Sequence, residues 1–275
     1  VLNLYLTVCQ IGKTTALQRQ MIGGTSNSIG MAIAPLVISY LIFHGTPLHD
    51  IVTKQFIIPL IVLILIMLIV TLFVGRIQMP SIGNVLQAPG ENLDKSVWSF
   101  RNLKLGVWGI FFYVGIEVAV GANVNMYASE LGGSFASNAT HMAALYWGLL
   151  LLGRFLGSFI RRIPSEKQLV TASIGAIILL VLAMLTANPW VLTLIGFFHS
   201  IMWPAIFTLA TDKLGKYTTK ASGVLTMGVI GGGIIPLLQG IFADVMGGNW
   251  LWTWLLVIAG EAYILYYGLN GYKQH

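Results

Sequence analysis

Long apolar runs, each about the length of one membrane crossing, alternate with short polar stretches along most of the chain. A span needs about 20 mostly apolar residues, because the hydrocarbon core of a bilayer is roughly 30 Å thick. By this measure the sequence predicts an all-α chain with eight spans and an apolar stub over residues 1–9. The predicted spans are 20–43, 55–74, 105–127, 136–160, 169–185, 190–210, 221–242 and 250–269.

The basic residues fall on one side of the membrane if the predicted spans alternate in direction. Loops 10–19, 76–104, 154–167 and 211–220, with the tail 270–275, carry fourteen of the 15 Lys and Arg residues. Only Lys54 falls on the other side. Because cytoplasmic loops carry an excess of Lys and Arg, we expect the first side, which includes the C-terminus, to be cytoplasmic. This bias accounts for the net charge of +6 without a nucleic-acid partner.

Composition indicates an integral membrane protein. Hydrophobic residues make up 56% of the chain and charged residues 9%, whereas a soluble domain carries about 25% charged residues. The single Cys9 excludes an internal disulfide and a cysteine metal cluster. A membrane enzyme would need a catalytic cluster such as paired carboxylates or a His-rich metal site, and neither pattern occurs. We therefore expect no enzymatic activity, no cofactor and no metal.

A weak internal repeat suggests two related halves. GMAIAPL at residues 30–36 and GGGIIPL at residues 231–237 share four of seven positions, and each follows a loop that contains Gly-Lys and threonines. The two predicted spans that hold these stretches point in the same direction. Parallel repeats of this kind mark the two halves of the major facilitator architecture.

Six stretches of the chain form a recognisable set of motifs. They are NLYLT from residue 3, TSNSIG from 25, YVGIEVAVG from 113, GRFLGSFIRR from 153, MWPAIFTLATDKLGKYTTKASG from 202 and VIGGGIIPLLQGIFAD from 229. Together they resemble the fucose–galactose–glucose proton symporters of the major facilitator superfamily. Two positions depart from that family's pattern: Leu4 replaces its usual proline, and Gly24 stands where some sugar symporters carry glutamine.

The resemblance implies an all-α membrane protein with the major facilitator superfamily fold. Residues 1–75 would be the remnant of the N-terminal bundle, namely the end of helix four with helices five and six. Residues 76–104 would be a cytoplasmic linker, and residues 105–275 the complete C-terminal six-helix bundle. Helices one to three, with the coupling carboxylates of the family, would lie upstream of Val1, so we expect the chain to be N-terminally truncated.

Glu117 is the strongest candidate for a transport site, because it lies near the middle of the predicted span 105–127. A charged carboxylate at that depth costs about 2.5 to 3.5 kcal/mol on insertion scales, so intramembrane ionisable residues usually have a function. We expect Glu117 to accept a sugar hydroxyl or to act as a protonatable gate, the alternative being a neutral carboxyl bonded to a neighbouring helix. Asn123, Asn125 and Gln239 are further candidates for substrate binding, with interhelical hydrogen bonds as the alternative.

The resemblance adds two more candidates for substrate binding. Asn27 matches a sugar-binding asparagine of the family, and an aromatic residue at the position of Trp203 lines the family's cavity. For Trp203 the alternative is packing or anchoring at the membrane interface. His199 lies four residues before Trp203 and hence on the same helix face. It is a candidate proton relay, with a satisfied core histidine as the alternative.

Three residues are candidates for gating. Arg154 lies near the cytoplasmic end of a predicted span, where it can pair with a carboxylate or with helix carbonyls and hold one conformation. The alternative is that it orients the protein in the membrane. Gly121 is a weak point at which the span 105–127 can bend. Pro236 removes one backbone donor from a glycine-rich span.

These features predict secondary active transport of a neutral hexose-type sugar, such as fucose, galactose or glucose, across the inner membrane by alternating access. We expect the full-length protein to be proton-coupled. Basic residues confined to span ends and loops favour a neutral substrate over an anion. The expected partners are the sugar, a proton, the lipid bilayer and the upstream helices of the same protein. The alternatives are a facilitator-type carrier for another small solute and a non-transporting membrane fragment.

Overall fold

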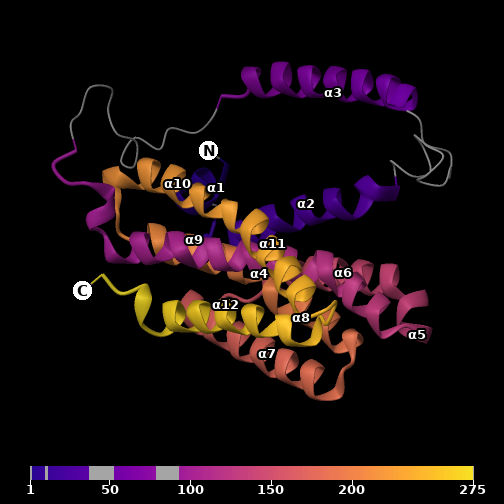
Figure 1. Ribbon diagram of the computed structural model, residues 1–275. Coiled ribbons are helices and arrows are strands. Elements are labelled where there is room, and N and C mark those ends of the chain that lie inside the picture. Colours follow the sequence, from indigo (N-terminus) through magenta and orange to yellow (C-terminus); the bar gives the residue numbers. More distant parts are fainter. Residues whose placement is uncertain (1, 10–11, 37–52, 79–92, 275) are drawn as a thin grey trace. The chain divides into compact units, whose positions relative to one another are not determined.

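The computed structural model describes residues 2–9, 12–36, 53–78 and 93–274, and every regular element among them is a helix (Figure 1). This confirms the all-α prediction for the described residues. Contacts divide the chain into two units. One consists of Val1–Ser28 with Ile82–His275, and the other of Ile29–Ser81.

The unit Ile29–Ser81 contains the end of α2 (Ala16–Leu36), the short η3 (Thr53–Phe56) and α3 (Ile57–Arg76). Helix α3 is apolar all round, with a mean hydropathy of 3.4 and no buried residue. Such a helix needs an apolar environment such as lipid on every side. The helix predicted over residues 55–74 is therefore confirmed, whereas residues 37–43 of the predicted span 20–43 lie outside the described residues.

The other unit contains α1 (Leu2–Val8), the first part of α2 and every helix from α4 onward. The longer ones are α4 (Arg101–Leu131), α6 (Ala139–Gly157), α7 (Ser165–Thr186), α8 (Pro189–His199), α9 (Met202–Thr211), α10 (Thr218–Thr226), α11 (Gly231–Val245) and α12 (Trp254–Tyr266). The shorter ones are η4 (Val97–Ser99), α5 (Gly133–Ser137), η5 (Gly215–Tyr217), η6 (Met227–Ile230), η7 (Leu251–Thr253) and the π-helical η8 (Tyr267–Gly271).

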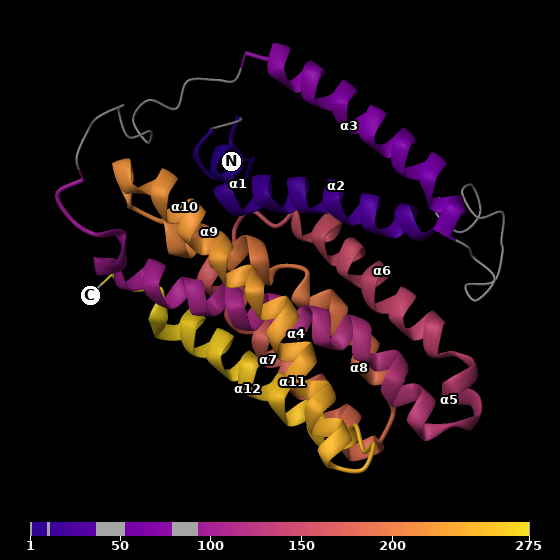
Figure 2. The same cartoon turned by 45° about the horizontal axis from the view of Figure 1, so that its top comes forward.

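Helix α4 runs through the middle of this unit. It contacts α6, α8, α9, α11 and α12, as both views of the ribbon show (Figures 1 and 2). Small residues allow these close approaches. A Cβ atom added at Gly231 of α11 would collide with the backbone carbonyl of Phe111 on α4, and one added at Gly115 of α4 would collide with Ile235. Close backbone contact through glycine is the usual packing mode of membrane helices.

Two predicted spans are interrupted helices. The predicted span 190–210 consists of α8 and α9, with the break at Ser200 and Ile201. Pro204 explains this break, because proline has no N–H for the carbonyl four residues earlier and its ring clashes there. The predicted span 221–242 likewise contains α10, a 3₁₀ segment from Met227 to Ile230, and α11. These interruptions lie where the sequence is rich in Gly and Pro.

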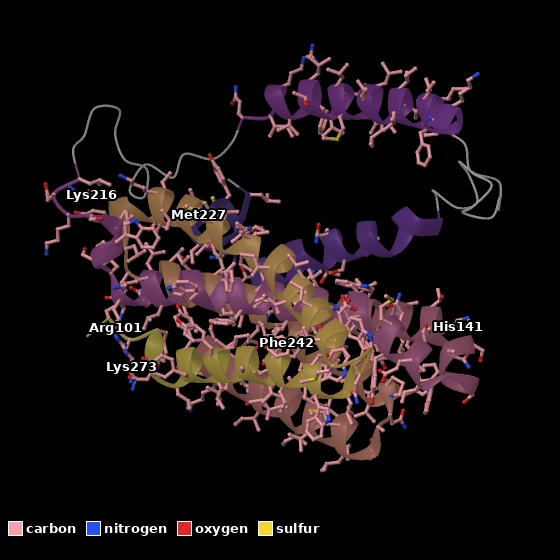
Figure 3. The ribbon with its side chains drawn as sticks, in the orientation of Figure 1. Arg101, His141, Lys216, Met227, Phe242 and Lys273 are labelled. Carbon is pink, nitrogen blue, oxygen red and sulfur yellow. The ribbon has the colours of Figure 1, made fainter. Side chains whose placement is uncertain are left out.

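Basic side chains gather at one end of this unit. Figure 3 shows Arg101, Lys216 and Lys273 at that end and His141 at the opposite end. Arg101, the first residue of α4, donates hydrogen bonds to the carbonyls of Asn270 and Lys273 at 2.8 and 3.0 Å. A cation placed there satisfies carbonyl groups at the end of the last helical segment that have no partner within the helix.

Five helical segments among the described residues are long and apolar enough to cross a membrane. They are Ile57–Arg76, Arg101–Leu131, Ser165–Thr186, Pro189–Thr211 and Gly215–Val245. Each coincides with one predicted span: Ile57–Arg76 is shifted by two residues from 55–74, and the other four extend beyond their spans at each end. The hydrophobic pattern therefore located these spans correctly, although it did not show where two of them are interrupted.

Candidate functional site

Glu117 lies halfway along α4, as predicted, and it forms an ion pair with Arg154 of α6. Arg154 Nη2 is 3.3 Å from Glu117 Oε1, and the side chains of Arg154 and Glu117 are 8% and 13% exposed. Tyr113, one turn earlier on α4, donates a hydrogen bond to the same oxygen at 2.7 Å. Spacing of four residues places Tyr113 and Glu117 on one helix face. Among the described residues both donors bind Oε1, so Glu117 Oε2 is left for another partner.

Arg154 also reaches α2, near the beginning of the chain. Its Nη1 donates to Ser28 Oγ at 2.7 Å and to the carbonyl of Gly24 at 3.4 Å. Gly24 makes room for this contact, because a Cβ atom there would lie 3.3 Å from Arg154 Cδ. We call Ser28, Tyr113, Glu117 and Arg154 the Arg154 cluster. The predicted pairing of Arg154 with a carboxylate and a helix carbonyl is confirmed, whereas its gating role stays a prediction.

A second polar chain lies beside this cluster and is completely buried. The Tyr146 hydroxyl of α6 is 2.6 Å from His199 Nδ1 of α8, and His199 Nε2 is 2.6 Å from Glu261 Oε1 of α12. Tyr146 also donates to the backbone carbonyl of Glu117 at 3.1 Å, which joins the chain to α4. All three side chains are 0% exposed. His199 thus has a partner on each ring nitrogen, and its predicted role as a proton relay stays a prediction.

Aromatic rings connect the two groups. The ring of Tyr113 lies 6.2 Å from that of His199 and 6.5 Å from that of Trp203, measured between centroids. Trp203 is half-buried and stacks on Phe207 at 6.3 Å. The prediction that His199 and Trp203 share one helix face agrees with these contacts, because both face Tyr113. Trp203 therefore borders the Arg154 cluster.

The three predicted amide candidates of the C-terminal part form a separate group. Asn123 Nδ2 donates to Gln239 Oε1 at 2.9 Å, and Gln239 Nε2 donates to Thr253 Oγ1 at 3.1 Å. Asn123 lies six residues beyond Glu117, which is about 9 Å along an α-helix. Asn125 is half-buried, and its Oδ1 is buried with no hydrogen-bond partner among the described residues. The interhelical bonds expected as an alternative exist for Asn123 and Gln239, and substrate binding by the three stays a prediction.

The remaining candidates lie at helix contacts or on exposed surface. Asn27 precedes Ser28 on α2 and is exposed. Gly121 is buried in the unbroken α4, where an added Cβ would collide with Trp147. Pro236 lies inside α11, which continues through it. The gating roles of Gly121 and Pro236 and the sugar-binding role of Asn27 stay predictions.

Comparison with known proteins identifies the family. The model of the Major Facilitator Superfamily matches residues 18–235. The chain belongs to the major facilitator superfamily. Two curated relatives are a putative glucose/galactose transporter of Helicobacter pylori and a glucose/galactose transporter of Brucella abortus. Each is 34% identical over 99% of this chain, which covers 70% and 67% of their respective lengths.

More distant relatives support the same family. An L-fucose-proton symporter of Escherichia coli is 27% identical over 69% of this chain and 45% of its own length. A crystal structure of the major facilitator transporter FucP in the outward conformation superposes with a TM-score of 0.80. It matches 98% of this chain and 71% of its own, at 23% identity. These comparisons confirm the resemblance drawn from the motifs, and they place the chain among multi-pass membrane transporters rather than enzymes.

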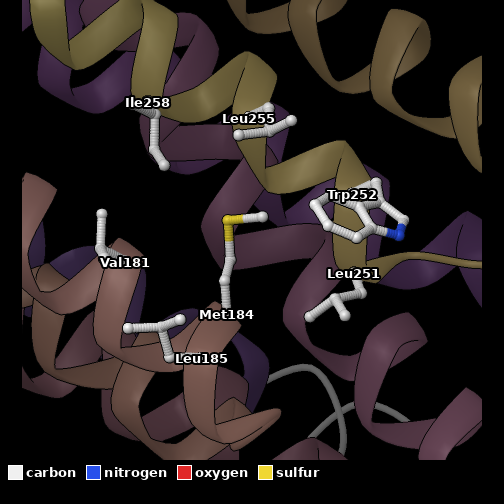
Figure 4. Close-up of a pocket in the computed structure, with 7 residues that line it drawn as sticks. All are labelled: Val181, Met184, Leu185, Leu251, Trp252, Leu255 and Ile258. Atoms are coloured by element: carbon white, nitrogen blue, oxygen red, sulfur yellow. The ribbon is translucent and has the colours of Figure 1, made fainter.

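An apolar groove lies between α7 and α12. Figure 4 shows its lining, and its volume is about 240 Å³. The residues that line it are Val181, Met184, Leu185, Leu251, Trp252, Leu255 and Ile258. A sugar needs several hydrogen-bond partners for its hydroxyls, and this lining offers at most one indole N–H. The groove is therefore unsuited to a sugar.

Two partners of Arg154 in the candidate site were not predicted from the sequence. Tyr113 and Ser28 were not candidates, although both contact Arg154. The spacing of Tyr113 and Glu117 could have pointed to the first, whereas nothing in the sequence places Ser28 beside Arg154, 126 residues away. Glu261 of α12 bonds to His199. No group of three or more potential metal ligands occurs in the part of the chain that the structure describes.

Proposed function

We propose that this protein carries a neutral hexose-type sugar, of the fucose, galactose or glucose kind, across the inner membrane together with a proton. Transport proceeds by alternating access, the mechanism of the superfamily. Two lines of support exist: the relatives named above as sugar transporters, and a polar cluster in mid-helix beside aromatic rings. The basic end of the helices, where Arg101, Lys216 and Lys273 lie, faces the cytoplasm in this proposal.

The observation that carries the proposal is the environment of the Glu117 carboxylate, namely its burial and its hydrogen-bond partners. The carboxylate is mostly buried and held by Tyr113 and Arg154 on one oxygen. The other oxygen, Oε2, is an acceptor of the kind that sugar hydroxyls require. Trp203, which is half-buried and lies beside Tyr113, supplies aromatic surface on which the apolar face of a sugar ring packs.

The charge balance of the Arg154 cluster favours a neutral substrate. Arg154 and Glu117 compensate each other at 3.3 Å. An anionic substrate would have to compete with Glu117 for Arg154, and a cationic one would have to displace Arg154 from Glu117. A sugar requires neither exchange. Asn27, Asn123, Asn125 and Gln239 are proposed as further hydrogen-bonding groups along the path, because amides both donate to and accept from hydroxyls.

Gating is assigned to Arg154, Gly121 and Pro236. Arg154 holds Ser28 of α2 with one nitrogen and Glu117 of α4 with the other. A substrate that hydrogen-bonds to Glu117 changes the interaction of Glu117 with Arg154. The hydrogen bond from Arg154 to Ser28 on α2 then changes in strength. Gly121 and Pro236 are positions at which α4 and α11 bend.

The test uses the protein expressed from its complete gene in proteoliposomes. Uptake of labelled fucose, galactose and glucose is measured with and without an inward proton gradient. We expect saturable uptake of at least one hexose, accelerated by the gradient. No uptake of any of the three would refute the sugar assignment, and uptake independent of the gradient would refute proton coupling alone.

A companion measurement tests Glu117 itself. Glu117→Gln retains the shape of the side chain and removes its charge, so we expect weaker sugar binding and slower uptake. The control is Asp244→Asn, which removes an exposed carboxylate at the end of α11. Sugar affinity and rate that are unchanged in Glu117→Gln would exclude Glu117 from the site.

A further inference from the structure

The buried chain of Tyr146, His199 and Glu261 contains an ionisable pair that the sugar site does not use. Glu261 and His199 lie on α12 and α8, both are 0% exposed, and 2.6 Å separates Glu261 Oε1 from His199 Nε2. Glu261 Oε2 is buried without a hydrogen-bond partner among the described residues. Burying an ionisable pair at this depth costs free energy, most of all when the pair carries a net charge. Ionisable residues inside the membrane therefore usually have a function.

Proton counting shows that the three residues have two distinct states. The Tyr146 hydroxyl has one proton, and it has two neighbours: His199 Nδ1 at 2.6 Å and the Glu117 carbonyl at 3.1 Å. The carbonyl can only accept. If Nδ1 lacks a proton, it must accept from Tyr146, and the carbonyl then loses this donor. If Nδ1 carries a proton, it donates to the Tyr146 oxygen, and the hydroxyl is free to donate to the carbonyl.

The two states differ by one proton on the Glu261–His199 pair. In the first state Nε2 donates its proton to the Glu261 carboxylate, and the pair has a net charge of −1. In the second state the pair has one more proton. One proton is on Nδ1 and another lies between Nε2 and Glu261, so the net charge of the pair is zero. Both contacts of Tyr146 are satisfied as hydrogen bonds only in the second, neutral state. A hydrogen bond from Tyr146 to the carbonyl together with one from Nδ1 to Tyr146 therefore requires the protonated pair.

We propose that Glu261 and His199 form a proton-binding site within the C-terminal bundle, and that Tyr146 transmits its occupancy to α4 at Glu117. This inference rests on the proposed transport function and adds a proton site to it. The carbonyl of Glu117 is the acceptor for the N–H of Gly121 in a regular α-helix. A second donor on that carbonyl, present only when the pair is protonated, competes with this helical bond at the glycine where α4 is expected to bend.

The surroundings of the pair contain few other titratable groups. On α4, the ring of Tyr113 packs against that of His199. Glu117, one helical turn beyond Tyr113, has Arg154 of α6 as its counter-ion. Helix α7, which contacts α8 and α12, carries Glu166 and Lys167 in its first turn only. On α12 itself, Tyr263 donates to the carbonyl of Leu105. Because Arg154 and Glu117 neutralise each other, no described group on these elements compensates a charge on the pair.

The first experiment measures sugar-linked proton uptake by the purified protein, expressed from its complete gene, in weakly buffered detergent solution. Sugar affinity is measured alongside as a function of pH. We expect wild-type affinity to fall at least about fivefold as the pair loses its proton, because coupling between two sites is typically of that size or larger. Glu261→Gln still accepts a hydrogen bond from His199 but cannot titrate. It should retain affinity at acidic pH within about threefold, with a flatter pH dependence and less proton uptake.

The control is Asp244→Asn, which should behave as wild type in both measurements. A Glu261→Gln variant that binds sugar with the wild-type pH dependence and the wild-type proton uptake would overturn the inference. Tyr146→Phe separates the proton site from its transmission, because phenylalanine removes only the hydroxyl. It should retain proton binding by the Glu261–His199 pair and lose the pH dependence of sugar affinity.

A second measurement tests the site even if these variants fold poorly or if no hexose binds. All other histidines of the protein expressed from its complete gene, including the four others of this chain, are replaced by glutamine, and ¹⁵N-labelled histidine then reports on His199 alone. We expect NMR spectra to show Nδ1 changing from a hydrogen-bond donor to an acceptor when the pair loses its proton. An Nδ1 without a proton throughout, or one that never changes, would overturn the inference. Absence of hexose binding in the wild type, in contrast, would refute only the proposed function.

Discussion

Replacing Glu117 by glutamine removes one charge of the ion pair and leaves Arg154 charged in a nearly closed environment. The two charged atoms are 3.3 Å apart, and the side chains are 13% and 8% exposed. At an effective dielectric constant near 20, this separation corresponds to an attraction of about 5 kcal/mol. The glutamine carbonyl still accepts a hydrogen bond from Arg154, which returns about 1.5 to 3 kcal/mol. We therefore expect Glu117→Gln to lower the free energy of unfolding by about 2 to 3.5 kcal/mol.

The assay is chemical unfolding in detergent micelles, followed by tryptophan fluorescence, for a double-mutant cycle. Its members are wild type, Glu117→Gln, Arg154→Gln and the double variant. The matched control is Asp94→Asn, which breaks the ion pair with Lys216 at 3.5 Å, where the side chain of Asp94 is 78% exposed. Water screens that pair, so the control should lose less than about 1 kcal/mol.

The decisive quantity is the coupling energy of the cycle. If Glu117 and Arg154 compensate each other, the double variant loses less than the sum of the single variants, by about 2 kcal/mol or more. Losses that add to within about 0.5 kcal/mol would show that the two charges do not depend on each other. Compensation between the two charges would then be refuted, and with it the charge balance that favours a neutral substrate.

Three further predictions concern packing and the candidate path. Gly231→Ala should destabilise the protein by about 1 to 3 kcal/mol, because the added methyl group meets a backbone carbonyl of α4. Gly233→Ala, on the same helix with nothing within 4 Å, should change little, and equal melting temperatures of the two variants would contradict this. Asn123→Leu should cost about 1 to 3 kcal/mol by leaving the buried Gln239 Oε1 without its donor. Adding Gln239→Leu should recover part of that loss, and a purely additive double variant would argue against the pair. Trp203→Ala should weaken sugar binding more than Trp203→Phe, as measured by calorimetry, and equal affinities would remove its ring from the site.

Much of the helical architecture could be predicted from periodicity and hydropathy alone. A run of about 20 apolar residues has one stable solution in a bilayer, because every backbone polar group must be bonded within the segment. For this reason the span predicted over 55–74 agrees with the observed α3 (Ile57–Arg76) to within two residues at each end. The interruption before Pro204 follows from the missing N–H of proline, whereas the 3₁₀ segment Met227–Ile230 was not predicted, because a glycine such as Gly228 permits several backbone geometries.

By itself, the sequence determined that this is an all-α membrane protein of the major facilitator superfamily, with a carboxylate halfway along one span. Hydrophobicity, charge bias and motifs are local properties, and they suffice for those conclusions. Only the tertiary structure decided the partners: Arg154 for Glu117, and His199 for Glu261, which lies 62 residues away. Partners of this kind lie on different helices, and their contact depends on how each helix is rotated about its axis. That rotation is set by packing of the whole bundle, through close approaches such as that of Gly231 to α4, and no single segment encodes it.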